Sequence, residues 1–148
     1  MIPAMNVTRQ YASIQDELDK AALEVLHGGQ YILGKTVEDF EKTFAAYCDT
    51  KYAVGVGNGS DALVMALKAC GVKSGDEVIT TAMSFSATAE AITSVGATPV
   101  FVDCTRDTYA IDPEEIRKHV TEKTKAIIPV HLYGQCADMD VINSIAKA

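Results

Sequence analysis

A glycine-rich segment, Gly55–Leu63, contains the residues of this sequence with the clearest chemical meaning. An apolar stretch passes through glycines directly into a helical pattern that begins at Ser60. The N–H groups of a first helical turn and the positive end of the helix dipole attract an anion, and glycines let the backbone approach it. The Ser60 hydroxyl can cap the helix or donate to a phosphate oxygen. The segment therefore predicts a phosphate site, and a serine-capped turn without a ligand is the alternative.

Two well-known phosphate loops do not fit this segment. A Walker loop requires Gly-Lys-Ser/Thr, and no lysine lies here. The dinucleotide fingerprint G-x-G-x-x-G fits in part, because the third glycine comes one residue early. The acid that this fingerprint requires would be Asp76, which precedes its predicted strand instead of ending it.

A second segment, Thr80–Ala89, places small hydroxyl residues around one aromatic residue, Phe85. It follows a predicted parallel strand, on the side where open α/β sheets bind ligands. The Phe85 ring can lie against a flat ligand ring, and such stacking adds about 0.5–1.5 kcal/mol beyond burial of area. The alternative is that Phe85 packs in the core, as an isolated Phe more often does.

Helical periodicity predicts two helices in the first third of the chain. The first covers residues 14–26, after a cap at Ser13 and before a stop at Gly28-Gly29. The second covers residues 37–47, behind an acidic capping box formed by Thr36 and Asp39.

From Tyr52 onward, short apolar runs alternate with helical segments. The predicted strands are residues 52–56, 77–80, 99–102 and 126–132, and the predicted helices are residues 60–70, 86–95, 113–120 and 138–148. This alternation predicts an α/β fold with a mostly parallel sheet that helices cover on both faces. The last helix reaches Ala148 without a Gly or Pro stop, so we expect the fold to be incomplete at its C-terminus.

Composition narrows the class of protein. The 148 residues are 48% hydrophobic and 22% charged, which favours one globular domain over disorder. The net charge of −7 with scattered basic residues disfavours a nucleic-acid or anionic-membrane surface. No signal peptide or membrane helix is indicated, so we expect a cytoplasmic protein. The four cysteines lack metal-site spacing, so we expect reduced thiols and no metal.

Several blocks of the sequence together resemble one enzyme family. In chain order they are Tyr31–Gly34, Val37–Glu41, Tyr52–Leu63, Gly75–Ile79, Ser84–Ala89, Gly96–Asp103 and Ile127–Gln135. Their order and spacing are similar to the start of the DegT/DnrJ/EryC1/StrS aminotransferases. The resemblance implies a three-layer, fold-type-I enzyme dependent on pyridoxal 5'-phosphate. Such an enzyme moves an amino group from an amino acid, usually glutamate, to a nucleotide-linked keto sugar.

The resemblance also assigns roles to individual residues. It implies that the backbone at Ser60 and Asp61, with the Ser60 hydroxyl, holds the cofactor phosphate, and that Gly59 allows close approach. It implies that Phe85 stacks on the pyridine ring, next to Ser84, where the family usually has Thr. The resemblance assigns no contact to a strand-end signature made by His131, Tyr133 and Gln135, and we expect His131 to be packed beside a turn.

The family's catalytic groups are expected beyond this segment. The resemblance implies that residues 1–148 are the N-terminal portion of the large cofactor-binding domain, without the small C-terminal domain. The lysine that holds the cofactor and the acid that pairs with the pyridinium nitrogen both come later in the family. We therefore predict no catalytic residue here and no transaminase activity from these residues alone. In the complete protein the family implies a homodimer.

Two other interpretations remain open. The chain can be a small doubly wound nucleotide-binding domain that uses the glycine loop for a pyrophosphate. It can also be a truncated, non-catalytic relative of the aminotransferases that acts through protein contacts.

Overall fold

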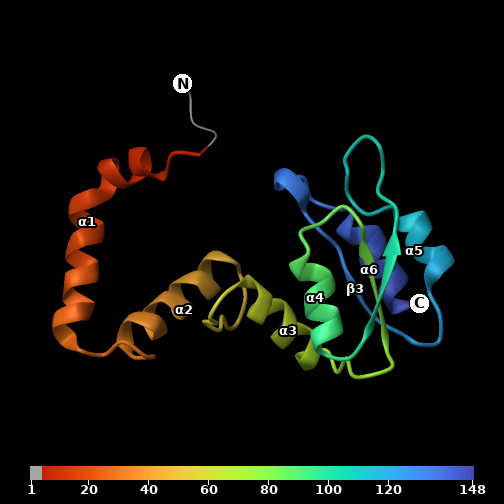
Figure 1. Cartoon of the computed structure of the whole chain (residues 1–148), viewed down its shortest axis with the longest axis horizontal. Helices are drawn as coiled ribbons and strands as arrows, with labels where there is room; N and C mark the ends of the chain where they lie inside the picture. The colour runs from red at the N-terminus through yellow and green to blue at the C-terminus, as the bar shows by residue number, and fades with distance from the viewer. Residues whose placement is uncertain (1–4) are drawn as a thin grey trace. The chain divides into compact units, whose positions relative to one another are not determined.

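The computed structural model describes residues 5–148, which form two compact units that divide after Gly55 (Figure 1). The first unit contains α1 (Val7–Gly28) and α2 (Lys35–Tyr47). Helix α1 ends where Gly29 adopts a left-handed conformation, with φ of 71°, and donates its N–H to the Val25 carbonyl oxygen at 3.1 Å. This confirms the predicted glycine stop.

The predicted starts of both helices in the first unit are wrong. Helix α1 begins at Val7, and the Ser13 signal marks an internal kink, where Ile14 leaves helical geometry. No side chain of residues 5–148 caps α2, which follows Gly34, and the capping box of Thr36 and Asp39 does not form. The Asp39 carboxylate instead accepts from Lys35 Nζ at 2.7–2.8 Å, and this hydrogen bond lowers the pKa of Asp39. Asp39 therefore pairs with Lys35, four residues before it on the helix, and not with Thr36.

The predicted strand over residues 52–56 is also wrong. Among the described residues, this stretch pairs with no strand, and its central Val54 is 77% exposed. The Gly55 N–H donates to Glu41 Oε1 of α2 at 2.7 Å, where a strand would use a neighbouring backbone carbonyl. An apolar run forms a strand only when a partner strand accepts its backbone hydrogen bonds.

The second unit is built on a parallel sheet, as predicted. Strands β1 (Glu77–Thr81), β2 (Thr98–Val102) and β3 (Thr124–Ile128) lie in the order β2-β1-β3, and both pairings are parallel. The other elements of this unit are α3 (Gly59–Ala69), α4 (Ala87–Ser94), α5 (Pro113–His119), the short 3-10 helix η1 (Leu132–Gly134) and α6 (Met139–Lys147). The alternation of strand and helix therefore follows the sequence prediction in this unit.

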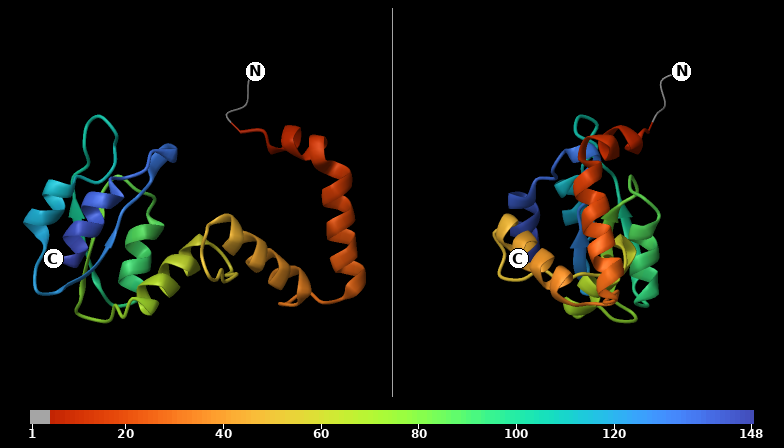
Figure 2. Two further views of the ribbon diagram at one scale, coloured as in Figure 1. Left: turned by 180° about the vertical axis from the view of Figure 1, so that it is seen from behind. Right: turned by 90° about the vertical axis from the view of Figure 1, so that its left-hand side faces the viewer.

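Helices cover both faces of this sheet, which makes the second unit three-layered. Val78 and Ile79 are both fully buried in β1, and because they are consecutive they point to opposite faces. Val78 packs with residues of α3 and α4, whereas Ile79 packs with residues of α5 and α6. Figure 2 shows α4 and α6 on opposite sides of the strands.

Strand β3 ends earlier than predicted, at Ile128 instead of Leu132. Pro129 follows and has no N–H to donate to a sheet ladder. The Ile128 carbonyl accepts the hydroxyl of Thr80 at 3.0 Å, and Thr80 is fully buried in β1. This side chain ties the ends of two neighbouring strands at the carboxyl edge of the sheet.

We predict that Thr80→Val lowers the free energy of unfolding by about 1–2 kcal/mol, because the partly buried hydrogen bond to the Ile128 carbonyl is lost. Urea denaturation of the variant measures this loss. Thr98→Val is the control, because Thr98 is an exposed residue of β2. Equal stabilities of the two variants would show that the Thr80 bond contributes nothing.

Candidate functional site

The N-terminus of α3 is capped by Asn58, so the alternative in which Ser60 caps the helix is wrong. Asn58 has extended backbone angles, and its side-chain oxygen accepts the Asp61 N–H at 2.9 Å. Its amide nitrogen also donates to Asp61 Oδ2 at 3.1 Å. Ser60 lies inside the first turn, and its hydroxyl makes no hydrogen bond with any residue from 5 to 148.

Three donors at this helix end therefore remain for a ligand. They are the Ser60 hydroxyl and the N–H groups of Gly59 and Ser60, which have no partner within a regular helix. The space beside Gly59 is open, since a Cβ placed there would meet nothing within 4 Å. The Asp61 N–H already donates to the Asn58 side chain, so it can donate to a ligand only if that side chain turns away.

Gly57 makes room for the Asp61 carboxylate. A Cβ on Gly57 would lie 2.7 Å from Asp61 Oδ2, well inside van der Waals contact. The carboxylate is thereby held between Gly57 and the Asn58 amide, near the positive end of α3. This glycine serves the internal packing of the loop, in contrast to Gly59, which faces open space.

The second predicted segment forms the turn between β1 and α4. Phe85 is 79% exposed, so the core-packing alternative for this residue is wrong. Its neighbours are fixed: the Ser84 and Thr88 hydroxyl oxygens lie 2.7 Å apart, and the Thr88 N–H donates to the Phe85 carbonyl at 3.1 Å. The turn thus presents an aromatic ring to solvent from a hydrogen-bonded backbone.

The structure places Gly59, Ser60 and Asp61 together and Phe85 in a separate turn. No hydrogen bond or ring contact joins the two groups among the described residues. They are connected through helix packing, because α3 lies against α4, whose first turn follows Phe85 (Figure 1). The four predicted cofactor contacts are all exposed residues of the second unit.

The turn after β3 contains a contact that the sequence did not reveal. His131 is exposed, and its Nδ1 accepts the Ala137 N–H at 3.1 Å. The prediction that His131 lies beside a turn is confirmed, but the ring is not packed in the interior. Tyr133 is 92% exposed and has a positive φ of 53°, and Gln135 Nε2 donates to the next carbonyl oxygen at 3.2 Å. The hydrogen bond between His131 and Ala137 spans six residues, and a contact at that spacing leaves no periodic pattern in a sequence.

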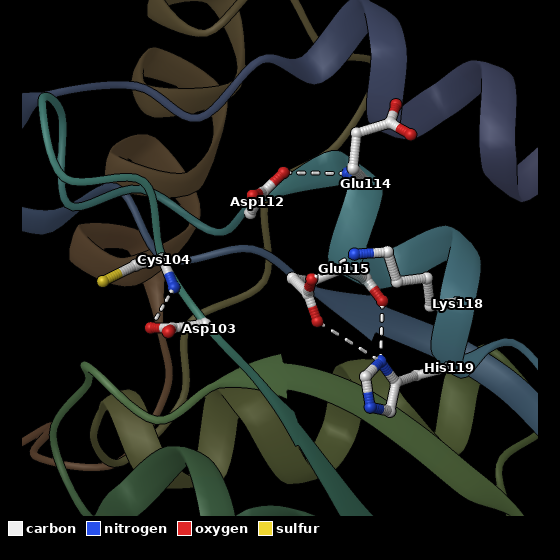
Figure 3. A network of polar contacts seen from close by, with 7 residues as sticks. All are labelled: Asp103, Cys104, Asp112, Glu114, Glu115, Lys118 and His119. Carbon is white, nitrogen blue, oxygen red and sulfur yellow. Dashed lines mark hydrogen bonds and ion pairs between the residues drawn. The ribbon is translucent and has the colours of Figure 1, made fainter.

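A charged network around α5, drawn in Figure 3, has the residue types of acid–base chemistry but not the environment. Lys118 Nζ lies 2.6 Å from Glu115 Oε1, and this hydrogen bond raises the pKa of Lys118. His119 Nδ1 lies 2.8 Å from the Glu115 carbonyl oxygen. Both contacts join residues three or four positions apart on one side of α5, where such pairs stabilise a helix only weakly. We therefore assign them to helix stability.

Two further expectations from the sequence concern metal binding and membrane-spanning helices. Residues 5–148 contain no group of three or more His, Cys, Asp or Glu side chains arranged to hold a metal ion. Over the same residues, no helix combines the length and apolar character that a membrane span requires.

Comparison with known proteins gives a consistent match. The model of the DegT/DnrJ/EryC1/StrS aminotransferase family matches residues 12–148. A pleiotropic regulatory protein of Geobacillus stearothermophilus is 51% identical over 99% of this chain and 39% of its own length. A dTDP-3-amino-3,6-dideoxy-alpha-D-galactopyranose transaminase of Aneurinibacillus thermoaerophilus is 47% identical over 99% of this chain and 40% of its own length.

Solved structures agree with the same match. Streptomyces venezuelae DesV, in complex with a ketimine intermediate, superposes with a TM-score of 0.96 at 42% identity over 99% of this chain and 39% of that chain. NtdA of Bacillus subtilis, with bound cofactor PMP, superposes with a TM-score of 0.92 at 39% identity over 99% of this chain and 34% of that chain. The chain thus spans about two fifths of the relatives that it matches.

We predict that Asn58→Ala lowers the free energy of unfolding by about 1 kcal/mol, because the Asp61 N–H loses its cap. Asn58→Ser retains a side-chain acceptor without placing a second carboxylate beside Asp61, so it is the matched control. Chemical denaturation measures both variants. Full stability of Asn58→Ala would mean that this side chain does not cap α3.

Proposed function

Because the chain belongs to the DegT/DnrJ/EryC1/StrS aminotransferase family, we propose that it is the cofactor-binding part of a sugar aminotransferase. The complete enzyme would transfer an amino group from an amino acid, with glutamate as the donor, to a nucleotide-linked keto sugar. The names of the matched transaminases support a nucleotide-sugar substrate. We further propose that this enzyme is a cytoplasmic homodimer and that residues 1–148 are the N-terminal part of its large domain.

The cofactor of the family is pyridoxal phosphate, and the exposed groups of this chain fit it. The Ser60 hydroxyl and the N–H groups of Gly59 and Ser60 suit the phosphate, with open space beside Gly59 for its approach. The Asp61 N–H would join them when Asn58 turns away. The observation that carries the assignment is the 79% exposed Phe85, an aromatic ring kept out of the core and available to a pyridine ring.

These residues bind and orient, and the chemistry depends on other groups. Bound pyridoxal phosphate supplies an electron sink for the bonds that change in transamination. It requires a lysine for covalent attachment and an acid at its ring nitrogen. No lysine of residues 1–148 lies in a segment like the family's lysine motif. We therefore propose that this segment does not transaminate by itself.

The binding role is tested by titrating the 15N-labelled chain with pyridoxal phosphate. We expect the Gly59 and Ser60 amide signals to shift, and Ser60→Ala to weaken binding about threefold to tenfold, which corresponds to about 0.7–1.4 kcal/mol, the net value of a typical hydrogen bond. Ser144→Ala, at an exposed position of α6, is the control. Shifts confined to other residues would refute the assignment.

The absence of a covalent lysine is tested by borohydride reduction after incubation with pyridoxal phosphate. We expect sparse labelling spread over the exposed lysines, because no lysine here has the family's motif. Mass spectrometry of the peptides measures the occupancy of each lysine. Stoichiometric labelling of a single lysine would contradict the proposal.

A non-catalytic regulatory role is the second candidate, and the name of the Geobacillus stearothermophilus relative favours it. Such a role predicts a stable chain that captures a protein partner and does not bind pyridoxal phosphate. The same titration separates the two candidates, because cofactor-induced shifts at Gly59 and Ser60 belong only to the first.

A further inference from the structure

Phe85 is held by its neighbours and not by the packing of its own ring. With 79% of its surface exposed, the ring gains little orientation from the core. The residue before it and the residue three positions after it are linked, since Ser84 Oγ and Thr88 Oγ1 lie 2.7 Å apart. Thr88 is only 8% exposed, and its N–H donates to the Phe85 carbonyl. A hydroxyl pair thus closes the backbone segment that carries the ring.

Both ends of this closed segment are anchored. On the strand side, the Met83 N–H donates to the hydroxyl of Thr81, a buried residue of β1, at 3.2 Å. On the helix side, Thr88 belongs to α4, which buries Ala91 and Ile92 in the core. The Ser84–Thr88 contact bridges the two anchors. Breaking it would leave the strand and the helix in place and loosen the turn between them.

We propose that Ser84 and Thr88 are positioning residues that fix the Phe85 ring for stacking on the pyridine ring of the cofactor. The inference rests on the proposed function, because it presupposes that Phe85 meets that ring. A ring that is already oriented loses less conformational freedom on binding, and residues behind a contact group supply that order. The phosphate donors lie on α3 and make no hydrogen bond to this pair. Ring recognition and phosphate recognition are therefore separable.

The test compares two ligands, pyridoxal phosphate and inorganic phosphate, by titration of the 15N-labelled chain. The ratio of their dissociation constants isolates the contribution of the ring. Thr88→Val keeps the shape and removes the hydroxyl, whereas Thr88→Ser keeps the hydroxyl. Thr93→Val is the matched control, because Thr93 is an exposed residue of the same helix whose hydroxyl, within residues 5–148, bonds only to the Glu90 carbonyl.

We expect Thr88→Val to weaken pyridoxal phosphate binding about twofold to tenfold, the range that one ring contact provides. Inorganic phosphate binding should stay unchanged. Thr88→Ser should retain the wild-type ratio, and so should Thr93→Val. Equal weakening of both ligands would overturn the inference, because it would show a structural role, and so would an unchanged ratio in Thr88→Val.

The wild-type chain separates this inference from the proposal on which it rests. If it binds both ligands equally, the ring contributes nothing, and the cofactor role of Phe85 fails together with the inference. If it prefers pyridoxal phosphate and Thr88→Val keeps that preference, only the inference fails. Should Thr88→Val not fold, Ser84→Ala removes the same contact from its other side, and its ligand ratio decides by the same criteria.

Discussion

The burial of β1 on both faces is the constraint on which the second unit depends. Val78, Ile79 and Thr80 are fully buried, and Thr81 is 1% exposed, so this strand meets helices above and below and a parallel strand on each edge. Such a strand cannot shift by one residue without exchanging its two faces. Its end is therefore fixed, and the Thr80 hydroxyl fixes the end of β3 as well. The turn that carries Phe85 begins directly after this strand.

The two groups that suit the cofactor are held by different means. The phosphate donors depend on the end of a helix, where Asn58 satisfies one N–H and the next positions face solvent. The aromatic ring depends on a short turn closed by two hydroxyls. Helix α3 packs on α4, so the same apolar cluster that covers one sheet face supports both groups. The proposed binding and orientation of the cofactor thus depend on α3 and on the β1–α4 turn, whereas the proposed chemistry requires other groups.

The sequence predicted the second unit well because its strands and helices are encoded by local patterns of residues. Runs such as Val78–Thr81 are apolar or compact on both faces, and the helices between them have regular periodicity. The sequence could not identify the residue that caps α3, because Asn58 and Ser60 are both good caps. Only the backbone angles show that Asn58 is the cap. The prediction of a strand at residues 52–56 failed because a strand needs a neighbouring strand as its hydrogen-bond partner, and composition does not show whether one is present. The exposure of Phe85 was likewise undecidable, because an isolated aromatic residue carries no periodic signal.

We propose that Phe85 and Ser60 contact one bound molecule of pyridoxal phosphate, and intermolecular nuclear Overhauser effects test this directly. We expect effects from the pyridine H6 proton and the 2-methyl group to the Phe85 ring and from the C5' methylene group, next to the phosphate, to the Gly59 and Ser60 amides. Stacked rings lie about 4.5–7 Å apart between centroids, so the nearest protons of the two rings lie closer together than the centroids. Effects from the pyridine ring to residues outside the β1–α4 turn, with none to Phe85, would contradict it.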